Sequence, residues 1–326
     1  MGRPLVKYGS RGSSVALVQR CLEARPVDSI FGSVTEEAVE MFQLDQQLGA
    51  DGVVGDNTWA ALEREFDLAP YPPQIPPLPD DETVAEILSV AEESAVARYQ
   101  WRDRGLAPDG YIPGMAMAYA TVYRKLLHRD PVVYEMARAN TGDSAHDALA
   151  WYDTIFATYG MSNDTAGVDT LRHLFVLLTG LGMRESSGQH CEGRDQSANN
   201  VSSDTAEAGL FQMSWNASNG TTDMAVLFDT WASGLSSDPP ACALAVFKEG
   251  VSCSSSDWQN YGSGKGASYQ KLAKSCPQFA VETAAVGLRV LRQHWGPINR
   301  HEAEVLEETD ELFQSIEPLI IPPESV

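Results

Sequence analysis

The sequence predicts a mainly α-helical protein with two domains, a small three-helix domain followed by a larger α-rich (α+β) domain. Apolar residues recur at helical spacing along most of the chain, which favours the helical class. The length of 326 residues suggests two domains rather than one. A single proline-rich stretch supplies the third observation, because it separates two regions that differ in size and pattern.

That stretch, APYPPQIPPLPDD (69–81), contains six prolines. Proline-rich segments favour an extended, semi-rigid spacer over a packed element. We therefore expect a domain over 1–68, a linker over 69–81 and a second domain over 82–326.

The N-terminal domain carries an internal repeat. The segments DSIFGSVTEEAV (28–39) and DGVVGDNTWAAL (51–62) share the pattern D-x-x-x-G-x-x-T-x-x-A-[VL]. Each copy predicts a tight turn with Asp and Gly, and then a Thr placed to cap a short helix. The segment 10–23 predicts a third helix, so this domain is expected to be a compact three-helix unit.

The C-terminal domain reads as a series of helices. The periodic segments lie at 83–104, 113–127, 131–140, 144–159, 168–185, 222–233, 268–275, 279–294 and 300–317. Between 186 and 220 the pattern breaks into Gly, Ser, Asn and Asp. A long irregular segment beside a buried helix is a common place for a functional site.

Composition excludes several classes of function. The net charge of −22 argues against binding to nucleic acid and against electrostatic adhesion to anionic membranes or wall polymers. The longest apolar run, LFVLLTGLGM (174–183), is too short for membrane insertion, and the first ten residues show no secretion signal. A neutral polymer such as a polysaccharide remains compatible with this charge.

The cysteine and histidine spacings match no metal site. Cysteines stand at 21, 191, 242, 253 and 276, and none of their spacings is a zinc pattern. Two disulfides within 191–276 would fit an oxidising compartment, with Cys242 and Cys253 close enough for a small loop and Cys21 left over. Reduced, buried cysteines are the alternative. No metal and no organic cofactor is expected.

Glu185 ends the apolar stretch LLTGLGMRESSG (177–188). Asp169 or Thr170 could cap the start of this predicted helix, whose C-terminal end would place Glu185 at the negative pole of the helix dipole. Partial burial would also disfavour the charged carboxylate, so both effects raise its pKa, as a general acid requires. The alternative is an exposed glutamate paired with Arg184.

The N-terminal domain resembles the peptidoglycan-binding type 1 domain over residues 5–66. The matching positions are Gly9-Ser10-Arg11-Gly12, Val15, Leu17, Gln19, Leu22, Asp28, Phe31-Gly32, Thr35, Ala38-Val39, Phe42-Gln43, Asp51-Gly52, Val54-Gly55, Thr58, Trp59 and Leu62. The segment between Leu22 and Asp28 is shorter than in the family. The resemblance implies that this domain binds peptidoglycan.

Residues 168–294 resemble the lysozyme-like glycan-cleaving superfamily, specifically goose-type lysozymes and soluble lytic transglycosylases. Three blocks carry the resemblance in the same order: Glu185-Ser186, Gly209-Leu210-Phe211-Gln212-Met213 and the loop NYGSGKG (260–266). It implies that Glu185 is the catalytic acid. It further implies that Ser186, Phe211, Gln212 and Tyr261 bind substrate, although Phe211, Tyr261 and also Trp215 could instead be packing residues.

The second carboxylate is less well defined by the resemblance. An inverting hydrolase needs a base that activates water, whereas a lytic transglycosylase needs none because the sugar's own 6-hydroxyl attacks. Asp204 is the first candidate for a second catalytic residue. Ser214 stands where goose-type enzymes have an Asp, and Glu192, Asp195 and Glu207 are further candidates. Hydrolase and transglycosylase therefore both stay open.

The combined expectation is a monomeric cell-wall enzyme that acts outside the cytoplasm. It would cleave the β-1,4 bond between N-acetylmuramic acid and N-acetylglucosamine in peptidoglycan, its partner. One alternative is a chitinase on the same scaffold, for which chitin oligosaccharides would be the partner. Another is a non-catalytic protein that binds the cell wall.

Overall fold

The structure is a computed structural model, and it describes residues 2–73, 80–194, 202–234 and 242–320. The chain forms two compact units, Met1–Ile75 with Ala217–Ser236, and Pro76–Asn216 with Ser237–Val326. The mainly α prediction is confirmed: the described residues form helices, and their only β pairings are isolated bridges. Residues 74–79 of the expected linker lie outside the described residues. The segment 217–236, which we expected in the C-terminal domain, groups with the first unit.

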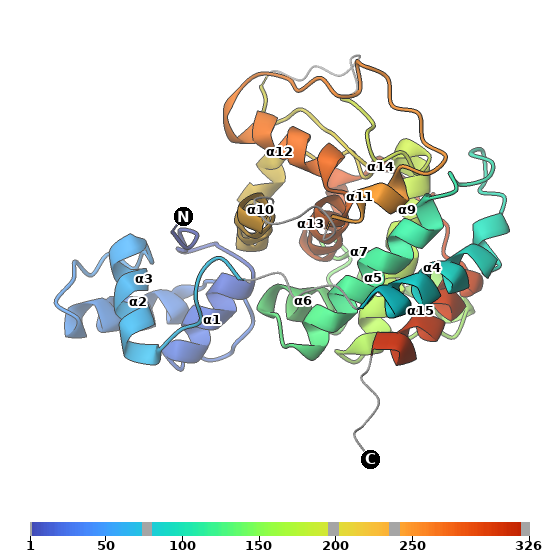
Figure 1. The fold of residues 1–326 in the computed structure, drawn as a ribbon. Coiled ribbons are helices and arrows are strands. Elements are labelled where there is room, and N and C mark those ends of the chain that lie inside the picture. The colour runs from blue at the N-terminus through green and yellow to red at the C-terminus, as the bar shows by residue number, and fades with distance from the viewer. Residues whose placement is uncertain (1, 74–79, 195–201, 235–241, 321–326) are drawn as a thin grey trace. The chain divides into compact units, whose positions relative to one another are not determined.

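The first unit contains the three predicted helices, α1 (Ser13–Cys21), α2 (Ser33–Asp45) and α3 (Asp56–Phe66) (Figure 1). Its fourth helix is α10 (Thr222–Gly234). The apolar faces of α1 to α3 meet in one core, which consists of Val6, Val15, Val18, Phe31, Val39, Phe42, Val54, Trp59, Ala61 and Leu62.

A buried glutamine organises each copy of the repeat. In the first copy the Gln19 Nε2 group donates to Asp28 Oδ1 (2.8 Å), to Ile30 O (3.1 Å) and to Thr35 Oγ1 (3.1 Å). Its Oε1 atom accepts from the backbone N–H groups of Asp28 and Ser29. One side chain thereby satisfies the polar groups of a whole turn, which would otherwise be costly to bury.

The second copy repeats this network almost atom for atom. Gln43 Nε2 donates to Asp51 Oδ1 (2.8 Å), Val53 O (3.0 Å) and Thr58 Oγ1 (3.1 Å). The expected capping role of the threonines is therefore wrong. Gly residues occupy the N-caps of α2 and α3 and form no side-chain cap, and Thr35 and Thr58 lie inside the first turns as partners of the glutamines.

A side chain of helix α10 caps the N-terminus of α1, where the N-cap residue itself offers no side chain. The N-cap of α1 is Gly12, and the Asp223 Oδ1 atom accepts from both the backbone N–H (2.8 Å) and the hydroxyl (2.5 Å) of Ser13. A Cβ on Gly12 would lie 2.7–2.8 Å from oxygen atoms of Thr221, Thr222 and Asp223. Only glycine allows this approach, so the end of α1 and the start of α10 are joined tightly.

The second unit holds the remaining helices. They are α4 (Asp81–Glu93), α5 (Tyr111–Leu127), α6 (Pro131–Met136), α7 (Ala148–Trp151), α8 (Asp153–Thr158), α9 (Val168–Ser186), α11 (Leu244–Phe247), α12 (Gly264–Ser275), α13 (Pro277–Val290), α14 (Gly296–Asn299) and α15 (Glu307–Ile320). Helices α4, α5 and α15 pack side by side (Figure 1). None of the described helices is both long and apolar enough to span a membrane.

Helix α9 forms the centre of this unit. Every residue from Thr170 to Met183 is buried, and the helix contacts α5, α13, α14 and α15. Its glycines allow close packing: a Cβ on Gly180 would lie 2.2 Å from the Glu304 carbonyl oxygen, and one on Gly182 would lie 2.3 Å from the Tyr111 hydroxyl. Gly167 is the N-cap, so neither Asp169 nor Thr170 caps this helix.

Two disulfides lie within 191–276, where the sequence favoured them. They join Cys191 to Cys253 and Cys242 to Cys276, so the small loop between Cys242 and Cys253 is not formed. Cys21 is a free thiol, and its partial burial raises its pKa.

The glutamine networks lead to a test of the first unit. Substituting Gln43→Met keeps the side-chain length but leaves the buried partners of the amide unsatisfied, so the unfolding free energy of this unit should fall by about 2–4 kcal/mol. Urea denaturation of the full chain measures this loss. The matched variant Gln46→Met, at the C-terminal end of α2, removes only an exposed hydrogen bond from Arg64 (2.7 Å) and should lower it by less than about 1 kcal/mol. Equal effects of the two substitutions would contradict the network's role.

Candidate active site

Glu185 lies in the last turn of α9, as the sequence predicted. The helix ends at Ser186, and the next two residues have the positive φ angles (54° and 76°) that turn the chain away. The Glu185 side chain is partly buried. Its carboxyl group forms no hydrogen bond or ion pair with any residue that the structure describes.

The surroundings of Glu185 favour its protonated form. Burial raises the pKa of the carboxyl to about 7, and the nearby Glu207 carboxylate acts in the same direction. The positive charges of Arg104, Arg300 and Arg184 oppose this increase without cancelling it. A carboxyl with this pKa can both donate and accept a proton near neutral pH.

Arg104 holds the end of α9 in place. Its guanidinium donates to the Arg184 carbonyl oxygen and, over 3.4 Å, to the Ser187 hydroxyl. Arg184 in turn forms ion pairs with Asp103 (3.6 Å) and Glu302 (3.5 Å). These contacts fix the backbone on both sides of Glu185.

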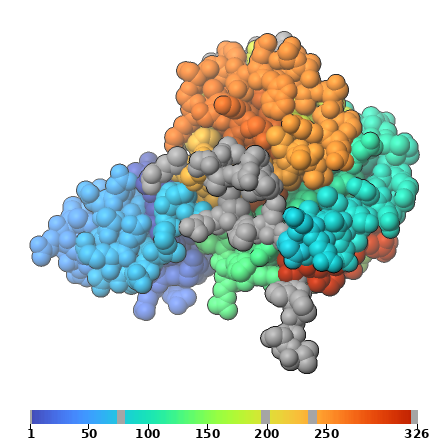
Figure 2. Space-filling view, viewed as in Figure 1, coloured from blue at the N-terminus to red at the C-terminus, as the bar shows by residue number. Residues whose placement is uncertain are grey.

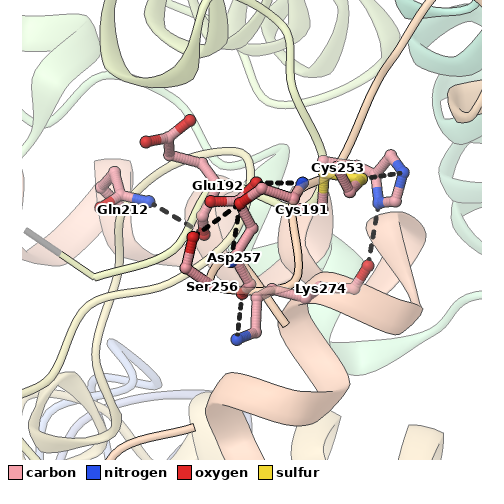
Figure 3. The surroundings of a disulfide bond; sticks show 9 residues. Cys191, Glu192, Gln212, Cys253, Ser256, Asp257 and Lys274 are labelled. Carbon is pink, nitrogen blue, oxygen red and sulfur yellow. Dashed lines mark hydrogen bonds between the residues drawn. A yellow bond between two sulfur atoms is a disulfide. The ribbon is translucent and has the colours of Figure 1, made fainter. Parts of the chain in front are cut away.

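The Gly-Leu-Phe-Gln-Met block lies against the loop that follows α9. The bridge between Ala208 and Met213 closes a tight turn around the block. The Glu192 carbonyl oxygen accepts from Gly209 N (2.8 Å) and from Gln212 Nε2 (3.4 Å), the contact drawn beside the disulfide in Figure 3. The fold therefore places Gln212 against the loop that follows α9, and it brings the Glu207 carboxylate close enough to act on Glu185.

Two residues expected to bind substrate are instead buried. Phe211 is only 1 % exposed, and its carbonyl oxygen accepts from the Trp295 indole N–H (2.8 Å). Ser186 is 4 % exposed, and its hydroxyl donates back to the Gly182 carbonyl oxygen (3.1 Å). Both side chains therefore support the site from the core and do not line a surface that a sugar could reach.

Asp204, the first candidate for the second catalytic carboxylate, contacts helix α12. Asp204 is exposed, and its Oδ1 atom accepts from the Gly266 N–H (3.1 Å) in the first turn of α12. Ser214 is buried and donates to Asn216 Oδ1 (2.7 Å). Asp195 lies outside the described residues. Glu207, one position before the bridge at Ala208, is the carboxylate that acts on Glu185, although its place in the sequence had favoured it less than Asp204.

Tyr261 lies at the surface of the loop before α12. Its ring is 36 % exposed, and the Arg194 guanidinium stacks over it at 4.5 Å from the ring centre. The Gln270 side chain holds this loop: Oε1 accepts from Tyr261 N (2.7 Å), and Nε2 donates to the carbonyls of Ser203 and Tyr261. Figure 2 shows this part of the chain, in orange, on the outside of the second unit.

Trp215 is half-buried in the same unit. The Lys265 ammonium lies 5.4 Å from its ring centre, and the Tyr269 ring lies 6.2 Å away. The indole is therefore engaged by neighbours in the fold, which agrees with a packing role.

Residues 11–62 match the family model described as "Putative peptidoglycan binding domain". The N-terminal unit thus carries a peptidoglycan-binding domain, as the repeat had indicated. This match supports peptidoglycan as the partner of this domain.

A crystal structure of the endolysin of Burkholderia AP3 phage is also similar to this chain. The two share 15% identity, and the match covers 97% of this chain and 100% of the other, with a TM-score of 0.17. A TM-score this low is not evidence for a common fold. The activity of the unit that follows the peptidoglycan-binding domain therefore has to be inferred from its own residues.

One group of possible metal ligands occurs among the described residues outside the peptidoglycan-binding domain. It consists of His190, Cys191 and Cys253. Both sulfur atoms are joined in the disulfide, and His190 Nδ1 contacts the Lys274 carbonyl oxygen (2.9 Å). The group therefore does not have the free thiolates that a metal ion requires.

The raised pKa of Glu185 predicts how stability depends on pH. The folded state binds this proton more tightly than the unfolded chain does, so the stabilising effect is complete below the unfolded pKa and is lost as the pH rises to about 7. The variant Glu185→Gln should therefore be more stable than the wild type by about 3 kcal/mol at pH 8 and about equal at pH 4.

Denaturant unfolding between pH 4 and pH 9 measures this difference. Glu92→Gln, an exposed position of α4, is the matched control and should leave the pH dependence unchanged. A Glu185→Gln variant that is no more stable than the wild type at pH 8 would show that Glu185 is not held in an unfavourable charged state.

Proposed function

We propose that the second unit cleaves the glycan strand of peptidoglycan at the β-1,4 bond between N-acetylmuramic acid and N-acetylglucosamine. One observation carries this proposal: a carboxyl group with a pKa of about 7 stands at the end of a rigid core helix, with no hydrogen bond or ion pair to a described residue. Glu185 would protonate the glycosidic oxygen as the bond breaks. The peptidoglycan-binding domain in the same chain makes peptidoglycan the natural substrate.

Glu207 is the second carboxylate of the proposed mechanism. Its charge helps to keep Glu185 protonated, and it can stabilise the positive charge that develops on the sugar as the bond breaks. A transglycosylase has no need of such a group. We therefore favour hydrolysis, with Asp204 assigned to the N-terminus of α12 instead of the reaction.

Gln212 and Tyr261 are the proposed substrate contacts. Gln212 belongs to the turn that carries Glu207, and the exposed ring of Tyr261 belongs to the loop before α12. Phe211 and Ser186 contribute indirectly, because their buried contacts fix the elements on which Glu207 and Glu185 stand.

The peptidoglycan-binding domain would raise the concentration of the catalytic unit at its substrate. Binding of one part of a chain makes the second encounter intramolecular, so the effective substrate concentration no longer depends on diffusion from solution. This arrangement suits action on the cell wall outside the cytoplasm. A monomer is sufficient for it, since both parts belong to one chain.

Substitution of the two carboxylates tests the assignment. Glu185→Gln and Glu207→Gln should each lower the rate of sacculus lysis, by about 10²–10⁴-fold for the acid, while binding to sacculi is retained. Asp204→Asn should retain most of the activity, because Asp204 contacts α12. Turbidity of a sacculus suspension measures the rate, and sedimentation measures binding. Full lysis by Glu185→Gln would overturn the function.

The products distinguish hydrolysis from transglycosylation. Mass spectrometry of digested sacculi should show reducing ends, because the second carboxylate supports attack by water. Products with 1,6-anhydro ends would instead identify a transglycosylase. Insoluble chitin, incubated in parallel, should release little, and release from chitin alone would identify a chitinase.

A further inference from the structure

A histidine lies beside the disulfide that joins Cys191 to Cys253. His190 Nε2 is 3.7 Å from Cys253 Sγ, a contact drawn next to the disulfide in Figure 3. One nitrogen of this ring and both sulfur atoms all lie within 4.8 Å of one another. Thiolate sulfur and imidazole nitrogen are the ligands that zinc prefers in proteins. The sulfur–sulfur bond keeps these atoms from binding a metal ion, and reduction of that bond would free them.

The His190 ring is already oriented as a metal ligand. Its Nδ1 atom lies 2.9 Å from the Lys274 carbonyl oxygen, which can only accept, so the ring hydrogen is assigned to Nδ1. In the neutral ring Nε2 then has a free lone pair, and Nε2 is the atom that faces Cys253 Sγ. Histidines that bind zinc through one nitrogen usually donate the other N–H to a backbone carbonyl or a carboxylate in this way.

The spacing of these atoms needs little change to fit zinc. Tetrahedral zinc holds sulfur at about 2.3 Å and nitrogen at about 2.0 Å, which places two sulfurs about 3.8 Å apart and a sulfur and a nitrogen about 3.6 Å apart. The separation of 3.7 Å between His190 Nε2 and Cys253 Sγ already agrees with the second value. The two sulfurs would move apart by about 1.7 Å on leaving the covalent bond, which rotation of the cysteine side chains can supply.

Contacts other than the disulfide hold the ligands near one another. Lys274 of α12 provides them on both sides. Its carbonyl oxygen binds the His190 ring. Its ammonium donates to the carbonyl oxygens of Asp257 (2.7 Å) and Gln259 (2.8 Å), which belong to the loop that begins at Cys253. The loop is therefore held close to His190 even where the sulfur–sulfur bond is broken.

The group is enclosed but accessible from one side. His190 and Cys191 are fully buried, whereas Cys253 is half-buried. The Trp258 indole packs near the imidazole, with 5.9 Å between the ring centres, and limits the access of water to it. The side of Cys253 leaves a path for a metal ion and for a water molecule as the fourth ligand.

We propose that the chain binds one Zn²⁺ ion at His190 Nε2, Cys191 Sγ and Cys253 Sγ when this disulfide is reduced. A dithiol supplies the two electrons and two protons that convert the sulfur–sulfur bond into two thiols, and is itself oxidised to a disulfide. Zinc then displaces both thiol protons into solvent. A reducing compartment keeps cysteines in the required state. The ion replaces the disulfide as the link between the loop after α9 and the loop before α12.

Metal titration of the reduced full chain tests the site. The chain is reduced under argon with a water-soluble phosphine and titrated first with Co²⁺ and then with Zn²⁺. Cobalt should give the thiolate charge-transfer and visible absorption bands of a tetrahedral site. One equivalent of Zn²⁺ should remove these bands, with a Kd of about 10⁻⁷ M or lower. The oxidised chain should bind neither ion.

Substitutions assign the ligands. His190→Gln and Cys253→Ser should each weaken zinc binding at least about 100-fold. His128→Gln, at an exposed histidine that caps the end of α5, should leave the affinity unchanged. The double variant Cys242→Ser/Cys276→Ser should also keep it, because no third ligand joins these two cysteines among the described residues. Circular dichroism of each reduced variant verifies its helical fold.

The link between the two loops gives a second measurement. Arg194 lies shortly after Cys191, and trypsin cleaves after arginine. In the reduced wild type, zinc should slow cleavage after Arg194 at least about fivefold, because it suppresses local opening of the loop. In reduced His190→Gln the same zinc concentration should have no effect. Cleavage of the wild type that is unchanged by bound zinc would contradict the link.

The outcomes separate this site from the alternatives. Loss of zinc binding in His190→Gln, with retention in both controls, supports the proposal. A reduced wild type that binds no zinc, or that binds it equally well after His190→Gln, would overturn it. Loss of binding in the double variant at 242 and 276 would place the metal at the other cysteines and would overturn it as well. These measurements do not depend on glycan cleavage, so the proposed function is tested separately.

Discussion

Helix α9 is buried along almost its whole length, and the position of Glu185 follows from that burial. A helix enclosed by α5, α13, α14 and α15 cannot shift its end without opening the core. Gly180 and Gly182 allow the neighbouring chain segments to approach its axis, where any larger residue would collide with Glu304 or Tyr111. The carboxyl of Glu185 is therefore held at one point, partly out of water, and that loss of water raises its pKa.

Burial also constrains the peptidoglycan-binding domain, where a few hydrogen bonds compensate for the burial of polar groups. This domain is small, so its turns cannot be buried deeply in an apolar core. Gln19 and Gln43 each form hydrogen bonds with the polar groups of one turn. The distances in the two copies are nearly identical, so the sequence repeat is also a structural repeat. Asp223 extends the pattern by capping α1 from a helix more than 200 residues away.

Periodicity predicted the helices well because burial on one side leaves a regular trace in the sequence. It could not predict which residues of a motif face a ligand. Phe211 and Gln212 are neighbours in one block, yet a tight turn buries the first and leaves the second beside Glu192. Nor could it rank Asp204 against Glu207, since only two residues of irregular chain separate them, and long-range interactions place the first against α12 and the second near Glu185 of α9.

The pKa of Glu185 depends on a balance between burial and the Glu207 carboxylate, which raise it, and nearby arginines, which lower it. Three arginines act on Glu185 and lower its pKa, and any further cation at that distance would return it to an ordinary ionised glutamate. Burial and Glu207 outweigh them, and Arg184 and Arg300 are also paired with Glu302. Carboxylates of this acidic chain pair with the arginines that fix the backbone, while the Glu185 carboxyl has no hydrogen bond or ion pair among the residues that the structure describes.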